Sequence, residues 1–324
     1  RDAVRSRGLG DVYKRQSLSS LPFASGMAPE SWSKGIALML QKKIGSTHVD
    51  KLRTITLCEA DFNYNNKHLG KHTMQHAELL NLIAPEQYGS RSGKSAIEHA
   101  LHKRLWYDIL RQSRRPGAMC SNDAKGCYDR IIHSIASLAY QRIGVPLPPV
   151  KSMLRTIQQM KHYIRTGYGD SAMYLDSNNS LNHFQGILQG NGAAPTTWVV
   201  ISTPLLNMLR SANNGSFLVS PLSKNTHHMV GFAFVDDTDL PTTDMRSLKT
   251  TEQTMEDMQE TIHRWEGGLK ATGGAIAPEK SWVYPIAFKF DDDGIWSYQT
   301  TEEIGATFMV KDEKEIMQEL TQYN

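Results

Sequence analysis

A run of apolar residues that ends in two adjacent acids constrains the fold of this chain more than any other feature. Residues 229–235 (MVGFAFV) carry no charge and are bounded by polar segments, which predicts a buried β-strand. Asp236 and Asp237 follow at once. Two carboxylates at the end of a strand repel each other unless water solvates them or a cation neutralises them. The run therefore predicts either an acidic turn or a cation site at the tip of a strand.

A second acidic segment lies upstream, at residues 121–129 (SNDAKGCYD), between a short apolar stretch and a predicted helix. Carboxylates on a rigid turn suit Mg²⁺, which takes one or two of them and completes its shell with water and substrate phosphates. Two such ions can stabilise the attacking and leaving oxygens of a phosphoryl transfer. Each segment alone is more typical of an acidic turn than of a metal site, because Asp is a common turn residue.

Composition excludes several classes of protein. Hydrophobic residues make up 40% of the 324 positions and charged residues 21%, so the chain can bury a core and is not wholly disordered. The sequence contains no run of 18 apolar residues, which argues against a membrane span. The three cysteines, Cys58, Cys120 and Cys127, are too few for a disulfide framework and predict a reducing, intracellular setting.

Charge is unevenly distributed along the chain. Residues 1–235 carry 28 Lys and Arg against 14 Asp and Glu, whereas residues 236–324 carry 8 against 19. The most basic run, residues 103–165, has 12 basic and 3 acidic side chains. A basic surface of that length fits nucleic acid, although solvated helix faces would give the same pattern.

Apolar periodicity predicts strands interleaved with helices, which is typical of an α+β or α/β architecture. Two short apolar runs around a polar connection, at 36–40 and 52–58, predict a β-hairpin. Apolar residues that recur every three or four positions predict helices within residues 97–109, 131–139, 150–164 and 255–265.

The two acidic segments belong to a series of four motifs that follow one another along the chain. Asp123 is followed by an aromatic residue, Tyr128, and then Gln189-Gly190 precede a proline in GILQGNGAAP. The third motif is FVDD at 234–237, and the fourth is a Gly-rich turn that leads to a lysine, GGAIAPEK at 273–280. This ordered set resembles the palm of reverse transcriptases, and most closely that of non-LTR (LINE-like) retrotransposons.

The resemblance extends upstream into the fingers. Residues 32–57 are similar to the fingers hairpin, in which a Lys and an Arg grip the triphosphate; Lys43 and Arg53 match them, although Thr54 replaces the usual proline. Residues 85–91 (PEQYGSR) resemble the family's Gln-x-Gly template-side motif. The matching residues of this motif are Gln87, Gly89 and Arg91.

The fold that the resemblance implies is α+β and of the right-hand polymerase type, with an antiparallel palm sheet backed by helices. A helical pattern at the C-terminal end stops without a cap, so we expect a fragment of a longer protein with the thumb largely missing. The expected divisions are a disordered or artefactual tail at 1–20, fingers at 21–115, a palm with inserted fingers helices at 116–310, and the start of the thumb at 311–324.

The function that the resemblance implies is RNA-directed DNA synthesis. We expect two Mg²⁺ ions, with Mn²⁺ as the alternative, and RNA template, DNA primer and dNTPs as partners; no membrane is involved. A retroelement would add an endonuclease domain and, in a eukaryote, a nuclear location. The expected catalytic residues are Asp123, Asp236 and Asp237, which ligate metal together with the carbonyl of Ala124; the expected nucleotide-binding residues are Lys43, Arg53, Tyr128, Gln189, Gly190 and Lys280.

Three alternatives stay open at this point. An RNA-dependent RNA polymerase shares the palm, but Gln189-Gly190 and the bulky Tyr128 argue against it. An inactive RNA-binding descendant of a polymerase would be expected to have lost metal-binding acids, and all three are present. A structural protein with accidental acidic turns leaves the order of the motifs unexplained.

Overall fold

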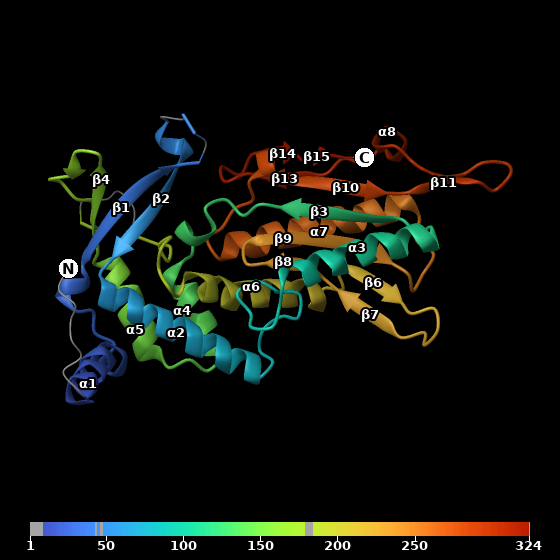
Figure 1. Ribbon diagram of the computed structural model, residues 1–324. Helices are drawn as coiled ribbons and strands as arrows, with labels where there is room; N and C mark the ends of the chain where they lie inside the picture. The colour runs from blue at the N-terminus through green and yellow to red at the C-terminus, as the bar shows by residue number, and fades with distance from the viewer. Residues whose placement is uncertain (1–8, 43, 46–47, 179–183, 324) are drawn as a thin grey trace. The chain divides into compact units, whose positions relative to one another are not determined.

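The computed structural model describes residues 9–42, 44–45, 48–178 and 184–323 (Figure 1). The chain forms two compact units. The first comprises Arg1–Leu80 and Ile131–Thr197, and the second comprises Asn81–Arg130 and Trp198–Asn324. Helix α6 (Ala194–Ser211) begins in the first unit and continues into the second.

The first unit is built on a four-stranded sheet with the order β2-β1-β4-β5. Strands β1 (Lys34–Gln41) and β2 (Leu52–Cys58) are antiparallel, which confirms the predicted hairpin, and β4 pairs with β1 in parallel. The remaining elements of this unit are α1 (Leu9–Ser25), η1 (Glu30–Trp32), η2 (Val49–Lys51), α2 (Ala60–Leu79), α4 (His133–Arg142), α5 (Leu147–Gln158), β4 (Lys161–Thr166) and β5 (Gly169–Asp170).

Two expectations differ from the structure in this unit. The tail expected to lack structure through residue 20 contains helix α1 from Leu9 onward. This helix packs on α5, and the side-chain amide of Asn65 donates a hydrogen bond to the Ser19 carbonyl at 2.8 Å, so tertiary contacts hold it. The helix predicted at 150–164 ends at Gln158, because residues 161–165 pair with β1 within strand β4.

The second unit contains a larger sheet with the order β15-β10-β3-β9-β6-β7, in which β8 also pairs with β9. Strand β3 is antiparallel to both of its neighbours. The elements of this unit are α3 (Ala96–Ser113), β3 (Gly117–Asn122), η3 (Cys127–Asp129), β6 (Ser216–Val219), β7 (Thr226–Met229), β8 (Phe232–Phe234), β9 (Asp237–Asp244), α7 (Thr251–Ala271), η4 (Pro278–Lys280), β10 (Trp282–Ile286), β11 (Phe288–Phe290), β12 (Trp296–Tyr298), α8 (Thr301–Ile304), β13 (Met309–Lys311), β14 (Met317–Glu319) and β15 (Thr321–Gln322).

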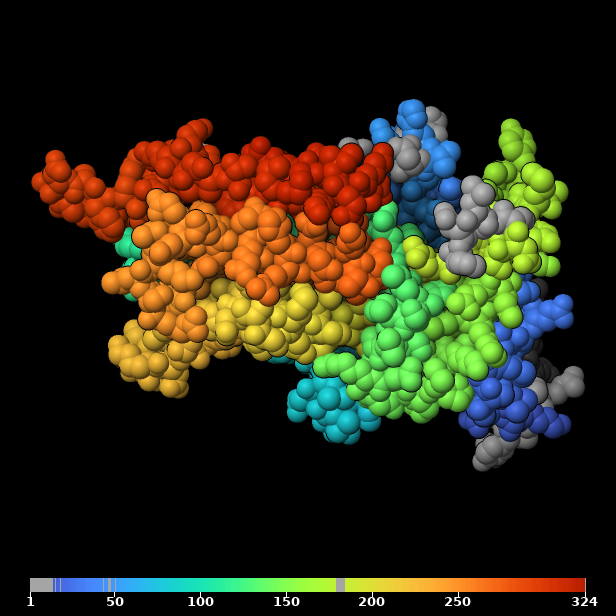
Figure 2. Space-filling model, turned by 180° about the vertical axis from the view of Figure 1, so that it is seen from behind, coloured from blue at the N-terminus to red at the C-terminus, as the bar shows by residue number. Residues whose placement is uncertain are grey.

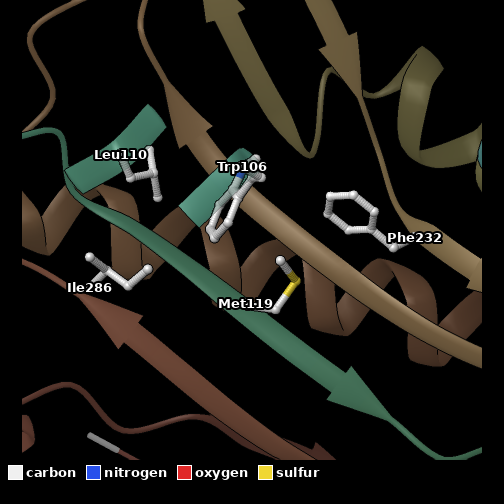
Figure 3. Close-up of a cluster of buried hydrophobic side chains, with 5 residues drawn as sticks. All are labelled: Trp106, Leu110, Met119, Phe232 and Ile286. Carbon is white, nitrogen blue, oxygen red and sulfur yellow. The ribbon is translucent and has the colours of Figure 1, made fainter. Parts of the chain in front are cut away.

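Helices α3 and α7 pack on opposite faces of this sheet. Trp106 and Leu110 of α3 form a buried cluster with Met119 of β3, together with Phe232 and Ile286 (Figure 3). Because side chains alternate along a strand, the neighbours of Met119 point to the other face, where α7 contacts β3 and β9. The single strand predicted at 229–235 is interrupted: β7 ends at Met229 and β8 begins at Phe232.

The C-terminal segment forms strands, so the helical pattern expected at 311–324 is wrong over the described residues. Strands β13 and β14 make a hairpin, and β15 pairs with β10 in parallel. In Figure 2 this segment (red) lies alongside α7 (orange). The side chain of Gln259 on α7 bonds both the N–H and the carbonyl of Met309, at 2.7 and 2.8 Å. Docking on α7 and on the sheet therefore overrides the local pattern.

The observed architecture is α+β, as expected. The divisions at residues 20, 115 and 310 stay predictions, and the structure groups α3 with β3 in the second unit. Within the part of the chain that the structure describes, no helix is long and apolar enough to cross a bilayer.

Candidate active site

The tip of the β8–β9 hairpin carries the two adjacent acids. Phe234 pairs with Asp237, which leaves Val235 and Asp236 as the turn. Val235 has a φ of 60°, a left-handed conformation that is unfavourable for a β-branched residue. Such a turn persists only where neighbouring groups hold it.

Gln87 is the main group that holds this turn. Its Oε1 accepts hydrogen bonds from the N–H groups of Val235 at 2.8 Å and Gly89 at 3.0 Å. Its Nε2 donates to the Val235 carbonyl at 3.0 Å and to Ser202 Oγ at 3.2 Å, and Trp198 Nε1 also donates to the Val235 carbonyl at 2.6 Å. Gln87 is fully buried, and its side-chain amide is occupied by bonds to the β8–β9 turn, Gly89 and Ser202. Its template-side role stays a prediction.

Gly89 and Arg91 also support the Val235 turn. A Cβ added at Gly89 would lie 2.2 Å from the Val235 nitrogen, a distance that no side chain tolerates. Arg91 Nη1 donates to the carbonyls of Ala84 and Gln87, at 3.3 and 3.0 Å, and so closes the loop that presents Gln87. The template-side role of both residues stays a prediction.

Asp123 lies at the end of β3, beside the hairpin. The β3–β9 register ends at Asn122 opposite Thr238, so Asp123 is the next residue along the edge that carries Asp237. Its N–H donates to Ser281 Oγ at 3.1 Å, and Lys280 Nζ lies 2.8 Å from its carboxylate. The predicted Lys280 is therefore an ion-pair partner of the predicted catalytic Asp123.

The carboxylates of Asp123 and Asp236 influence the ionisation of Asp237, and that of Asp236 also influences Tyr128. Burial raises the pKa of Asp237, and the neighbouring carboxylates of Asp236 and Asp123 raise it further. Burial also raises the pKa of the Tyr128 phenol, with Asp236 as the next contribution. Acids that repel one another in a partly buried site favour a bound cation.

No backbone group of the described residues donates to the carbonyl of Ala124. The bridge between Ala124 and Ile276 uses the carbonyl of Asp123 and the N–H of Lys125, so neither bond consumes the Ala124 carbonyl. Among the described residues, no three His, Cys, Asp or Glu side chains lie close enough together to hold a metal ion as they stand. The donors are nevertheless the hard oxygens that Mg²⁺ prefers.

The Gln189-Gly190 loop belongs to the first unit, where it packs on the edge of β2. The N–H of Thr56 donates to the Gln189 carbonyl at 2.8 Å. Gly190 has a φ of 112°, and a Cβ there would lie 2.5 Å from the Thr56 carbonyl oxygen. Arg53 lies on the same strand and is exposed. Strand β2 thus carries Arg53 and also contacts the Gln189-Gly190 loop. Lys43 lies outside the described residues.

Asn63 on α2 is a residue that the sequence did not single out. Its Nδ2 donates to the Gly190 carbonyl at 3.2 Å, and its Oδ1 accepts from the Gly192 N–H at 2.7 Å. One amide therefore fixes both sides of the loop. A single Asn on a helix gives no sequence signal for such a contact, because its partner lies 127 residues away.

The basic run at 103–165 is partly neutralised by acids. Six of its 12 basic side chains form ion pairs with acids that the structure describes, which reduces the charge it offers to phosphates. The six are Lys103, Arg104, Arg111, Lys125, Arg130 and Arg165.

Solved structures with a similar fold include two yeast telomerases. Apo telomerase from Candida tropicalis, truncated from its C-terminal domain, superposes with a TM-score of 0.52 at 11% identity, over 95% of this chain and 60% of that one. Telomerase from Candida albicans in complex with the TWJ fragment of telomeric RNA gives 0.51 at 10% identity, over 79% and 43%. This chain thus spans about 60% of the first of them.

Sequence comparison gives the family directly. No curated protein matches the chain. The family model described as reverse transcriptase (RNA-dependent DNA polymerase) matches residues 40–290, a span that includes both acidic segments and the Gln-Gly loop. The chain belongs to the reverse transcriptase family.

Proposed function

We propose that this chain is the fingers-and-palm part of an RNA-directed DNA polymerase, which adds deoxynucleotides to the 3′-hydroxyl of a primer paired to an RNA template. The observation that carries the proposal is the coupling of Asp123, Asp236 and Asp237 at the strand ends of one sheet, with Tyr128 beside them. Structural neighbours under 25% identical support the fold alone, and the family supplies the reaction class.

Metal binding is assigned to the same acids. Asp123, Asp236 and Asp237, with the carbonyl of Ala124, would hold two divalent cations, Mg²⁺ or Mn²⁺. When bound, these ions lower the pKa of the primer hydroxyl and neutralise charge on the phosphates. Lys280, which pairs with Asp123, would donate a proton to the leaving pyrophosphate.

Nucleotide binding is assigned to five further residues. Arg53 and Lys43 would neutralise the triphosphate. Gln189 and Gly190 would lie against the template–nucleotide pair, where a glycine permits close approach of the backbone. The Tyr128 ring would exclude a 2′-hydroxyl, because close-packed sites tolerate little added volume.

The wider context of the enzyme is also proposed. The motifs resemble those of non-LTR retrotransposons, which would supply an endonuclease domain in the full-length protein and, in a eukaryotic host, a nuclear location.

Single-nucleotide incorporation on a DNA primer and an RNA template tests the proposal, with dNTPs and rNTPs compared side by side. The protein assayed is a longer chain that includes the thumb, because we expect the fragment to be poorly processive or inactive alone. We expect divalent-metal-dependent incorporation that favours dNTPs, an unchanged preference in Tyr128→Phe, and increased rNTP use in Tyr128→Val. Equal loss of dNTP and rNTP incorporation in Tyr128→Val would make Tyr128 a core residue only. Preferential rNTP use by the wild-type chain would favour an RNA polymerase, and no incorporation at all would favour an inactive RNA-binding descendant.

A further inference from the structure

One face of α2 carries a row of rings and lysines. Residues three and four positions apart on a helix are neighbours, so this row lies on one side of α2. It extends about 12 Å from Tyr64 to His72, at 1.5 Å per residue. Most of its members are exposed, including the Tyr64 ring at 56%. We call this row the α2 track; it consists of Tyr64, Lys67, His68, Lys71 and His72.

The positive charge of the α2 track is free. Neither Lys67 nor Lys71 forms an ion pair with any residue that the structure describes, in contrast to the six paired side chains of the basic run. The sequence of α2 between Phe62 and Ala77 contains no acid. The track is therefore a continuous basic surface, which is complementary to a phosphate backbone.

The rings of the track form a stepped row. The Tyr64 and His68 rings meet edge to face with centroids 4.4 Å apart, and the His68 and His72 rings are stacked at 5.9 Å. Unpaired bases stack on exposed rings of this kind, whereas bases inside a duplex are already stacked on one another. Rings interleaved with lysines thus fit a single strand better than a duplex.

The α2 track begins beside the Gln-Gly loop. A Cβ added at Gly192 would lie 2.9 Å from the Cβ of Lys67, and Asn63, one position before Tyr64, bonds Gly190 and Gly192. Under the proposed function this loop lies against the template–nucleotide pair. The template that has not yet been copied is single-stranded and continues from that pair.

We propose that the α2 track binds the single-stranded RNA template ahead of the nucleotide pair, with Lys67 and Lys71 on its phosphates and the Tyr64, His68 and His72 rings against its bases. The inference rests on the proposed function, because that function assigns the Gln-Gly loop to the template–nucleotide pair.

Binding of fluorescent primer–template duplexes to the 324-residue chain tests this inference. One duplex carries a single-stranded RNA template overhang and the other is blunt. The variant is Lys67→Gln/Lys71→Gln, and the matched control is Lys151→Gln/Arg155→Gln, an exposed basic pair with the same spacing on α5 of the same unit. Gln and Lys have similar helix propensities, so both helices should be preserved.

We expect the α2 variant to bind the overhang duplex roughly tenfold more weakly at about 50 mM salt, with a salt dependence of log K reduced by about 1.4 for two phosphate contacts on a single strand. Its affinity for the blunt duplex should equal that of the wild-type chain, and the α5 control should bind both duplexes normally. A second variant, Tyr64→Ala/His68→Ala, should weaken overhang binding without changing the salt dependence.

Three results would overturn the inference: unchanged overhang binding by both α2 variants, equal weakening on the blunt duplex, or the same loss in the α5 control. Circular dichroism of each variant shows whether α2 is intact. The assay measures binding and not incorporation, so it decides this inference separately from the incorporation assay that tests the proposed function.

Discussion

The side chain of Gln87 bonds both backbone groups of Val235, accepting from its N–H at 2.8 Å and donating to its carbonyl at 3.0 Å. Val235 is the left-handed residue of the turn that presents Asp236, so one buried amide fixes the conformation that the turn would not adopt by itself. The Gln-x-Gly motif of this chain therefore fixes the β8–β9 hairpin that carries Asp236 and Asp237.

Replacing Gln87 with Leu should destabilise the second unit and impair the active site. The substitution leaves the buried N–H of Gly89 and the half-buried N–H of Val235 without their partner, which costs about 1–3 kcal/mol for a fully buried group. Urea unfolding should show this loss, and single-nucleotide incorporation should fall through kcat more than through KM. Ser202→Ala is the control, because it removes one partner of Gln87 and leaves both bonds to Val235. Incorporation by Gln87→Leu at the wild-type rate would show that the turn holds its shape without the amide.

Substitution of Gly190 by Ala should disrupt the Gln-Gly loop. An added Cβ would meet the Thr56 carbonyl oxygen at 2.5 Å, and the φ of 112° is unfavourable for any L side chain. We expect a stability loss of about 1–3 kcal/mol and a raised KM for dNTP. Gly167→Ala is the matched control in the same unit, since a Cβ there meets no atom within 4 Å and its φ is not positive. Equal effects of the two substitutions would contradict the loop geometry.

His133 should make the first unit less stable in mild acid. Its Nδ1 accepts from the Gln158 amide at 3.0 Å, so its Nε2 carries the proton and donates to the Gly186 carbonyl at 2.7 Å. Burial lowers the pKa of this neutral imidazole below 6.5, although the Gly186 carbonyl opposes the shift. The unfolded chain then binds the proton more readily, so stability is lost as the pH falls below about 6.5.

Urea unfolding at several pH values measures the effect of His133. The free energy of unfolding of the wild-type chain should decrease from pH 6.5 to pH 5, and His133→Gln should decrease less steeply, by at most about 1.4 kcal/mol per pH unit. Parallel curves for the two proteins would mean that His133 does not contribute to the acid sensitivity.

Local sequence patterns predicted which segments form helices and strands better than they predicted which side chains are buried. The recurrence of Ile97, Leu101 and Leu105 predicted the helix that became α3, yet these three side chains are 84%, 54% and 47% exposed, and Trp106 and Leu110 face the sheet instead. Periodicity identifies a helix, but the face that is buried depends on which residues fit the neighbouring strands.

Long-range pairing explains what the sequence did not predict. The C-terminal segment has a helical pattern, but Leu320 is buried at 1% exposure where the chain returns to the sheet as β15. The order of the acidic motifs predicted Asp123 and Asp236 as neighbours of one sheet. The role of Gln87 was not predicted, because its partner Val235 lies 148 residues further along the chain.

Single-nucleotide incorporation by Asp236→Asn, measured alongside the affinity of the same protein for primer–template, tests the assignment of the metal-binding acids. The substitution removes a charge that would hold metal and leaves the basic surfaces unchanged, and the two contributions are separable. We expect that incorporation in Mg²⁺ is lost and that primer–template affinity is retained. Incorporation by Asp236→Asn at a rate comparable to the wild-type chain would contradict that assignment.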